Sequence, residues 1–368
     1  MPASHRYKNY INLVLPIFNT KRTREILQVN PVVETQRTDA TETHISVYEY
    51  SGEYLQEFQF NEIKACLEFS RHSEHFRWIN IDGLRKADVN AVCGAFDIHP
   101  LLEEDILSIG QRPKMDEINE RLFCVLNMLY FNENTSSVES EQISIALGKN
   151  FVISFQEDPS RDVFNPLREK LKIASSKIRQ SSSDYLCYTM LDLIVDNYFV
   201  VMERIGDRIE DIEEEIIRFS NTRSLARINR IRKELIVLKR NFLPVRELIG
   251  GIIRSDSDLL EDRTTKYFKD IYDHILQAAD LAENYRDMVM NLQDLYISNV
   301  NMKMNEVMKI MAIVTCLLAP ATVIGGIFGM NFDKIPYLHN EHGFWIAVGL
   351  MLLIPVWMLW VFKKRNWF

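Results

Sequence analysis

Hydrophobic and charged positions are distributed very unevenly along this chain of 368 residues. Residues 1–305 mix charged and apolar side chains, whereas residues 310–330 and residues 343–362 contain no charged residue. Each uncharged run matches the roughly 20 residues that a helix needs to cross a bilayer. The pattern therefore predicts a large soluble region followed by two C-terminal membrane spans.

The first part of the soluble region alternates between strand and helix patterns. Strands are predicted over His44–Tyr50, Phe76–Asp82 and Arg121–Asn132, and a hairpin over residues 142–156 with its turn at 148–150. Helices are predicted over residues 61–72 and Pro100–Leu107. Residues 1–43 show no recognisable pattern. These elements predict an N-terminal α/β domain over residues 1–165, on the cytosolic side.

Residues 166–305 show helical patterns only. The serines before Asp184 predict the start of a helix that ends near Phe219, and a second helix is predicted over residues 224–247, ending near Gly250 and Gly251. Residues 252–319 contain neither glycine nor proline, so a helix that begins near Thr264 can continue unbroken into the first span. Such a stalk would be roughly 80 Å long at 1.5 Å per residue.

Apolar or small residues recur along the stalk in steps of three and four. They are Ala278, Leu281, Tyr285, Met288, Leu292 and Leu295. A seam with this spacing packs against partner helices. Because one copy of the stalk has no evident way to cover the seam, we expect several copies to gather around a symmetry axis. The pattern does not set their number.

Small and hydroxyl-bearing residues line one face of the first span, over residues 306–331. With the residues just before it, this stripe comprises Asn305, Met308, Thr315, Ala319, Thr322, Gly326 and Gly329. Small residues also occur where membrane helices pack closely, so the stripe by itself slightly favours a packing face. Together with the seam on the stalk it favours the wall of a pore, while the remaining apolar faces suit lipid or the second span.

Charge sets the expected topology. Lys363, Lys364 and Arg365 follow the second span, which with this tail occupies residues 343–368, whereas the loop over residues 332–342 carries two acids and one lysine. Basic segments remain in the cytosol, so the tail is expected there and the short loop outside. With two spans, the N-terminal domain shares the cytosolic side.

Gly329, Met330 and Asn331 lie where the first span must end at the outer surface. Asn331 offers an amide oxygen without charge. Mg²⁺ prefers oxygen ligands and loses its water reluctantly, so a ring of neutral oxygens can hold the hydrated ion weakly enough to release it. These three residues are the predicted selectivity filter.

Composition excludes several other classes. The formal net charge of -8 counts against a nucleic-acid partner, and the five cysteines never form the paired spacing of a zinc site. The sequence contains no phosphate-binding loop and no nucleophile–base constellation. We therefore expect neither an enzyme nor an organic cofactor; the ligand would be the divalent cation itself.

The segment Ile327-Phe328-Gly329-Met330-Asn331-Phe332, a second span and a basic tail together resemble the CorA family of magnesium and cobalt transporters. Residues 98–107, 111–114 and 272–274 also resemble segments of that family. The resemblance implies an α+β cytosolic domain, a funnel of long helices and two C-terminal transmembrane helices, mainly α overall. It further implies a homopentamer in a bacterial or archaeal plasma membrane that takes up Mg²⁺, with Co²⁺ or Ni²⁺ as further ions.

The resemblance also implies cytosolic regulatory sites between subunits that close the channel when internal Mg²⁺ is high. Asp105 and Asp270 match the first pair, while Glu104, Asp192 and His274 match the second. Judged without the resemblance, ordinary surface or helix-pair ion pairs, and a hydrogen-bonded core histidine at His274, are the preferred interpretation of these residues.

Two alternatives stay open at this point. A zinc transporter of the related ZntB type shares the two spans and a G-x-N motif, although the intact Met330 favours Mg²⁺ or Co²⁺. A membrane-anchored interaction protein without a pore would use the small-residue face only for helix packing.

Overall fold

The computed structural model describes residues 39–69, 75–158, 161–219, 221–330 and 342–365. The described residues form two compact units, the first within residues 1–215 and 221–292 and the second within residues 216–220 and 293–368. Asn331, the loop that follows it and residues 366–368 lie outside the described residues, as do most of residues 1–43.

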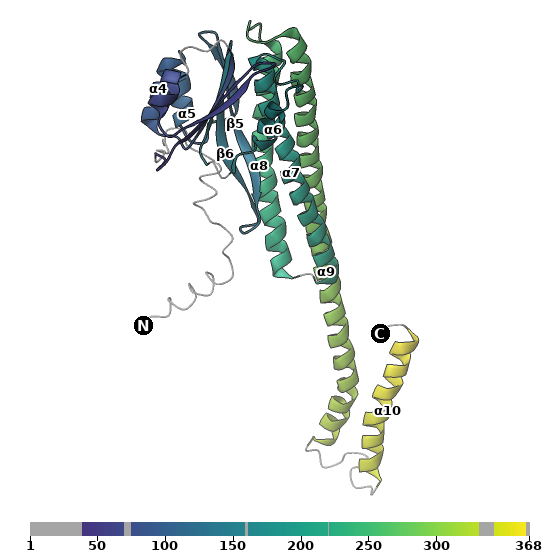
Figure 1. Cartoon of the computed structure of the whole chain (residues 1–368). Helices are drawn as coiled ribbons and strands as arrows, with labels where there is room; N and C mark the ends of the chain where they lie inside the picture. Colours follow the sequence, from purple (N-terminus) through teal and green to yellow (C-terminus); the bar gives the residue numbers. More distant parts are fainter. Residues whose placement is uncertain (1–38, 70–74, 159–160, 220, 331–341, 366–368) are drawn as a thin grey trace, which may run out of the picture. The chain divides into compact units, whose positions relative to one another are not determined.

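A seven-stranded sheet forms the centre of the first unit (Figure 1). The strand order is β2-β1-β3-β7-β6-β5-β4, and all neighbouring pairs are antiparallel except β3 and β7. The strands are β1 His44–Tyr50, β2 Leu55–Phe60, β3 Phe76–Asp82, β4 Lys114–Ile118, β5 Arg121–Asn132, β6 Ser137–Gly148 and β7 Phe151–Gln156. β1, β3 and β5 have the predicted bounds, and the predicted hairpin is the β6–β7 pair, which turns between Gly148 and Phe151.

The two strands that the sequence pattern missed, β2 and β4, are both edge strands of this sheet. Their sequences, LQEFQF and KMDEI, carry charged or polar residues at half or more of their positions, and none of their residues is buried. Charge on an edge strand prevents pairing with another molecule. Because it also removes the apolar alternation, these strands could not be recognised from the sequence.

Helices cover both faces of the sheet. α3 Ile63–Phe69, α4 Lys86–Ala95 and α5 Pro100–Leu107 enclose an apolar core with one face of the sheet. On the other face, α8 Thr222–Arg254 contacts β4, β5 and β6 (Figure 1). α5 has the predicted bounds, the described part of the predicted helix over residues 61–72 is shorter, and α4 was not predicted.

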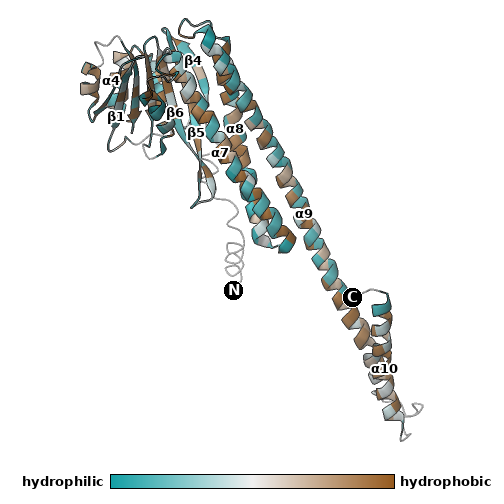
Figure 2. Ribbon diagram, turned by 45° about the vertical axis from the view of Figure 1, so that its right-hand side comes forward, coloured by the Kyte–Doolittle hydropathy of each residue, from teal (hydrophilic) through white to brown (hydrophobic). Residues whose placement is uncertain are grey.

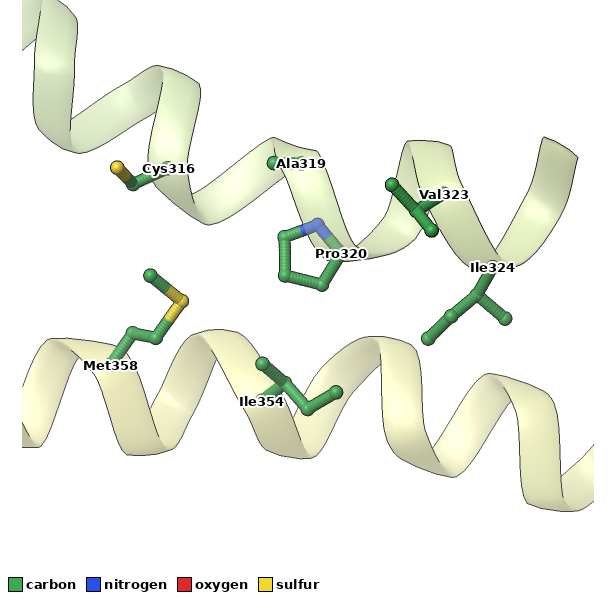
Figure 3. A pocket seen from close by; sticks show the side chains of 7 residues that line it. All are labelled: Cys316, Ala319, Pro320, Val323, Ile324, Ile354 and Met358. Atoms are coloured by element: carbon green, nitrogen blue, oxygen red, sulfur yellow. The ribbon is translucent and has the colours of Figure 1, made fainter.

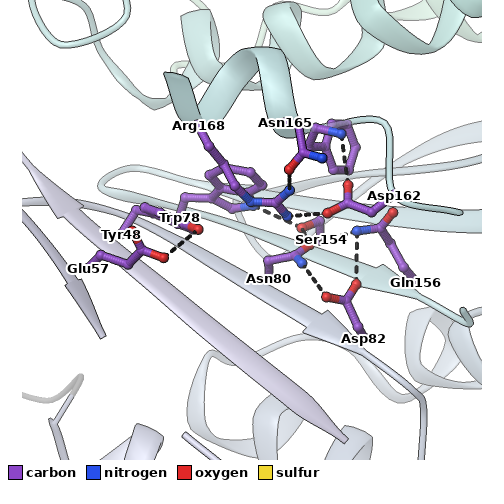
Figure 4. A network of polar contacts seen from close by, with 11 residues as sticks. Tyr48, Glu57, Trp78, Asn80, Asp82, Ser154, Gln156, Asp162, Asn165 and Arg168 are labelled. Carbon is purple, nitrogen blue, oxygen red and sulfur yellow. Dashed lines mark hydrogen bonds and ion pairs between the residues drawn. The ribbon is translucent and has the colours of Figure 1, made fainter. Parts of the chain in front are cut away.

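A buried polar network crosses the parallel pair β3–β7 (Figure 4). The Trp78 indole N–H donates to Ser154 Oγ over 2.9 Å, and Ser154 Oγ donates to Asn80 Oδ1 over 2.6 Å. Gln156 Nε2 donates to Asn80 Oδ1 and Asp82 Oδ1, over 2.9 and 3.0 Å. Since these buried groups find partners in only one alignment of the strands, the network specifies their register.

Five helices follow the sheet. They are α6 Asn165–Lys172, α7 Ser183–Arg218, α8 Thr222–Arg254, α9 Asp262–Phe328 and α10 Gly343–Lys364. The predicted unbroken helix is confirmed: α9 covers 67 residues and continues past Pro320. α7 begins at one of the predicted serines and ends one residue before Phe219.

The predicted end of α8 near Gly250 and Gly251 was wrong, because the helix continues to Arg254. A side chain at Gly251 would place its Cβ 3.1 Å from the Met115 methyl group. The glycine therefore allows β4 to lie close to the helix, and burial of Leu248 and Ile252 on either side outweighs the low helix propensity of glycine.

The premise that one copy cannot cover the stalk seam holds only in part, because Leu281, Tyr285 and Leu295 are half-buried within the chain. Eight residues of α9 are buried within the chain, namely Thr264, Phe268, Ile271, Ile275, Ala278, Ala282, Val289 and Leu292. Phe268 lies edge-on to Tyr188 of α7, and Tyr285 lies against α7 at Gly206. Of the predicted seam residues, Ala278 and Leu292 are buried here while Met288 stays exposed. The seam therefore carries little weight as an argument for an oligomer.

Among the described residues, α7, α9 and α10 are long and apolar enough to cross a membrane. The apolar window of α7 is 61% buried inside the protein, whereas those of α9 and α10 are 0% and 6% buried. In Figure 2 the ribbons of α10 and of the C-terminal part of α9 are coloured mainly toward the hydrophobic, brown end of the scale. The apolar residues of α7 are therefore explained by the core of the first unit. The two exposed apolar windows, in α9 and α10, coincide with the two predicted spans.

We predict that Glu141 makes the stability of the protein depend on pH. Its Oε1 accepts two backbone N–H groups, from Glu157 and Asp158, each over 2.8 Å, while its Oε2 is buried without a partner. Burial raises the pKa of Glu141 from 4.5 to about 7. The folded protein thus binds this proton more tightly than the unfolded chain, and the stabilisation present below pH 4.5 is lost as the pH rises toward 7.

Glu141→Gln should remove this contribution, which amounts to roughly 3 kcal/mol of unfolding free energy between pH 4.5 and 7.5. Thermal unfolding of the detergent-solubilised protein over this range measures it. Equal pH slopes for the variant and the wild type would contradict the assignment.

Candidate functional site

Three potential metal ligands converge between α7 and α9. Ligand atoms of Asp192, Asp196 and His274 all lie within 4.8 Å of one another. Asp192 and Asp196 are one turn apart on α7, whose opposite side buries Met190 and Ile194 in the core. Hydrophobic packing of α7 therefore presents both carboxylates toward α9. We name these three residues the α7–α9 cluster.

The α7–α9 cluster has unbalanced negative charge. Burial raises the pKa of Asp192, and the neighbouring Asp196 charge raises it further, while the Tyr188 hydroxyl donates to Asp192 Oδ2 over 3.3 Å. No ion pair with lysine or arginine reaches Asp192 or Asp196 among the described residues. His274 Nδ1 is buried and has no hydrogen-bond partner there. Two carboxylates and a free imidazole nitrogen form a set that a cation would complete.

Asp270 lies one turn before His274 on α9 and is exposed. Its charge contributes to the raised pKa of Asp192, so the two carboxylates are close enough to interact. The structure thus brings three predicted residues, Asp192, Asp270 and His274, to one place. Asp196 was missed, and its i, i+4 spacing from Asp192 was the signal that could have found it.

The ligand types limit which ions fit the α7–α9 cluster. Mg²⁺ takes oxygen ligands and keeps several waters, so it would bind the carboxylates partly through water. Co²⁺ and Ni²⁺ also accept imidazole nitrogen and bind mixed sets more tightly. The same cluster can therefore respond to both classes of ion.

The two predicted residues on α5 lie apart from this cluster. His99 caps the helix through a hydrogen bond from the Leu101 N–H, and Pro100 occupies its first turn. Glu104 is exposed, whereas Asp105 is buried and its carboxylate pairs with Lys114 Nζ at 2.6 Å. Within one chain, the partner of Asp105 is therefore a lysine that sequence reasoning did not single out.

The stripe predicted on the first span is exposed along α9. Asn305, Met308, Thr315, Ala319, Thr322, Gly326 and Gly329 are all exposed. The Thr315 and Thr322 hydroxyls donate to the carbonyls of Met311 and Leu318, over 2.9 and 3.0 Å. Since each hydroxyl proton is used by the helix, the oxygens offer their lone pairs outward as acceptors.

α10 packs on the other side of α9. Half-buried Ile313, Leu317 and Ile324 mark the covered face, and an apolar cleft lies between the two helices (Figure 3). Its lining comprises Cys316, Ala319, Pro320, Val323 and Ile324 of α9 with Ile354 and Met358 of α10. By helical geometry, Thr315, Thr322 and Gly326 lie nearly opposite the covered face. Ala319 alone among the stripe residues also lines the cleft.

The helix ends where the filter was predicted. α9 stops at Phe328, and the N–H groups of Gly329 and Met330 donate to the carbonyls of Gly325 and Ile327, over 2.9 and 3.3 Å. Gly329 and Met330 are exposed. Asn331, the third predicted filter residue, lies outside the described residues.

A sheet domain with potential metal ligands between its long helices, in a chain that also carries two exposed apolar helices, fits a membrane transporter for metal ions. A family model described as "CorA-like Mg2+ transporter protein" matches residues 73–364. The chain belongs to this family of membrane transporters for magnesium and cobalt, as its sequence resemblance predicted.

Individual relatives agree with the family model. The cobalt/magnesium transport protein CorA of Thermotoga maritima is 40% identical over 324 residues, which are 88% of this chain and 92% of that protein. The complete structure of the CorA magnesium transporter from Methanocaldococcus jannaschii gives a TM-score of 0.71 at 21% identity, covering 88% of this chain and 98% of that one. This likeness confirms the predicted fold class. The ZntB cytoplasmic domain of Vibrio parahaemolyticus gives 0.56 at 16% identity, covering 71% and 100%.

We predict that Asp196→Ala weakens Co²⁺ binding to the α7–α9 cluster about tenfold, because one of its three ligands is lost. The increase in melting temperature on titration with CoCl₂ measures the affinity in the purified protein. Asp280→Ala removes an exposed carboxylate from α9 outside the cluster and should behave like the wild type. An unchanged Co²⁺ titration for Asp196→Ala would exclude it as a ligand.

Proposed function

We propose that several copies of this chain, in a homopentamer, form a channel that takes up hydrated Mg²⁺, with Co²⁺ or Ni²⁺ as further ions. The observation that carries the proposal is the exposed stripe on α9, whose hydroxyl oxygens point away from the face that α10 covers. In a single copy this stripe would face lipid, which offers no hydrogen-bond partners. Around a shared axis the same stripes line an aqueous path.

The chemistry of the stripe fits a cation that keeps its water. A hydrated Mg²⁺ presents O–H donors on its outside, and Thr315 and Thr322 present acceptors without charge. Neutral acceptors guide the ion without trapping it. Methionine side chains such as Met308 are flexible and can adapt to the width of the path.

Membrane potential can drive this uptake without a chemical energy source. Moving a doubly charged ion inward through 100 mV, negative inside, releases about 4.6 kcal/mol. The basic residues that end α10, Lys363 and Lys364, favour a cytosolic tail and hence a cytosolic sheet domain. In this orientation Gly329, Met330 and Asn331 lie at the outer end of the path and form its selectivity filter.

Regulation by cytosolic Mg²⁺ is the role proposed for the acidic residues of the sheet domain. Asp105 of one subunit and Asp270 of the next would form the first site, and Glu104, Asp192 and His274 the second, to which the cluster geometry adds Asp196. Carboxylates on adjacent subunits repel each other when empty and are bridged when Mg²⁺ binds. Occupancy would thus favour the closed arrangement of the subunits.

The ZntB-type alternative shares the fold of the soluble domain. Zinc sites use thiolate and imidazole nitrogen, whereas the residues proposed here offer mainly oxygen. The remaining alternative is that the stripe only packs against other helices and lines no pore. In that case the outward hydroxyl oxygens of Thr315 and Thr322 would have no donor to bind. Mg²⁺ transport accounts for both features.

Asn331→Ala should abolish Mg²⁺ uptake into proteoliposomes, because the amide oxygens of the filter would be lost while the helices stay intact. Uptake is followed with a Mg²⁺-sensitive dye under an inward-negative potential. Light scattering in detergent checks that the variant keeps the mass of the wild-type assembly. Wild-type uptake by a correctly assembled variant would refute the filter assignment.

Asp270→Ala should keep conducting at millimolar internal Mg²⁺, a concentration at which the wild type closes, because one bridging carboxylate is lost. Flux recorded against internal Mg²⁺ gives the concentration for half closure. Asp280→Ala serves as the matched control on the same helix. If both variants close as the wild type does, Asp270 has no sensing role.

A further inference from the structure

The ammonium group of Lys114 forms an ion pair with the carboxylate of Asp105 in the same chain. Its Nζ lies 2.6 Å from Asp105 Oδ2 and 3.1 Å from Asp116 Oδ2. Lys114 and Asp116 are two residues apart on the edge strand β4, so both side chains lie on the same face of the strand. The ammonium group thus bridges α5 and β4 through two carboxylates.

The position of Asp105 is set independently of this lysine. Its backbone carbonyl accepts a hydrogen bond from Gln142 Nε2 over 2.9 Å, which ties α5 to β6. The Asp105 side chain is only 12% exposed, whereas that of Lys114 is 39% exposed. A cation that arrives from solution therefore meets the ammonium group at the carboxylate that it must bind.

We propose that Lys114 competes with Mg²⁺ for the carboxylate of Asp105 and thereby sets the Mg²⁺ concentration at which the Asp105 site fills. This inference rests on the regulatory role proposed for Asp105. The ammonium group and the divalent ion share one carboxylate and repel each other, so binding of Mg²⁺ requires Lys114 to move away. Asp116 receives the displaced ammonium, because it already lies within ion-pair distance, and no charge is left unpaired.

This arrangement has a physical consequence for sensing. Without a competitor, a carboxylate pair that includes the buried Asp105 would bind Mg²⁺ more tightly and stay occupied when the internal concentration falls. Competition from Lys114 raises the concentration needed for half occupancy without changing any ligand of the ion. The strength of its ion pair with Asp105 then determines the threshold.

The test compares Lys114→Met and Lys114→Gln with Lys114→Arg in the full-length protein, reconstituted in vesicles. Removing the positive charge should lower the MgCl₂ concentration for half closure about two- to fivefold. Lys114→Arg keeps the charge and should stay close to the wild type. An unchanged or higher threshold for both neutral variants would overturn the proposal, since a lysine that only positions Asp105 predicts weaker binding.

Asp116→Asn provides a second test, because it leaves Asp105 as the sole partner of Lys114. The threshold should rise in the wild-type background and change much less beside Lys114→Met. An equal shift in both backgrounds would mean that Asp116 acts on the ion directly and not through Lys114, which contradicts the proposal.

Protection from proteolysis by MgCl₂ in the purified protein measures site occupancy independently of conduction. It should show the same order of thresholds even for a neutral variant that conducts poorly. If the wild type closes with Mg²⁺ and Asp105→Ala does not, while the Lys114 variants match the wild type, only this inference fails. If the wild type shows no Mg²⁺-dependent closure, the proposed regulation itself fails.

Discussion

Packing of α7 against α9 is the interaction on which the rest of the structure depends. It buries the apolar face of α9 from Thr264 to Leu292 and excludes water from one side of the helix. Gly206 is essential to this contact, since a side chain there would place its Cβ 2.5 Å from the Tyr285 hydroxyl. The same packing holds the α7–α9 cluster together, because it brings a carboxylate pair on one helix against a histidine on the other.

The acidic residues of the sheet domain lie in two different electrostatic environments. In the α7–α9 cluster, burial and mutual repulsion act on carboxylates that no lysine or arginine neutralises among the described residues. Asp105 instead has a resident ammonium partner. The α7–α9 cluster, whose negative charge is not neutralised by a cationic side chain, attracts any divalent ion. Asp105 binds the ion only when its concentration is high enough to displace Lys114. Two thresholds can therefore coexist in one domain.

α9 connects these sites with the membrane segment as one continuous helix. Backbone hydrogen bonds are satisfied inside a helix, so the segment can enter hydrocarbon without unpaired polar groups. Pro320 removes one N–H donor, and the helix continues through it to Phe328. Within the second unit, α10 covers one apolar face of α9 and leaves the hydroxyl-bearing face uncovered.

Sequence alone determined the features that depend on local periodicity: the two uncharged spans, strands such as β1 and β3, the unbroken α9 and the polar stripe on it. It could not reveal the edge strands β2 and β4, whose charge hides their periodicity, nor the extension of α8 beyond its two glycines. Only tertiary structure decided that α7 covers part of the stalk seam, that Asp196 joins Asp192 and His274, and that Lys114 holds Asp105. The physical reason is that these relations join residues far apart in the chain, and their geometry follows from the packing of whole helices and strands.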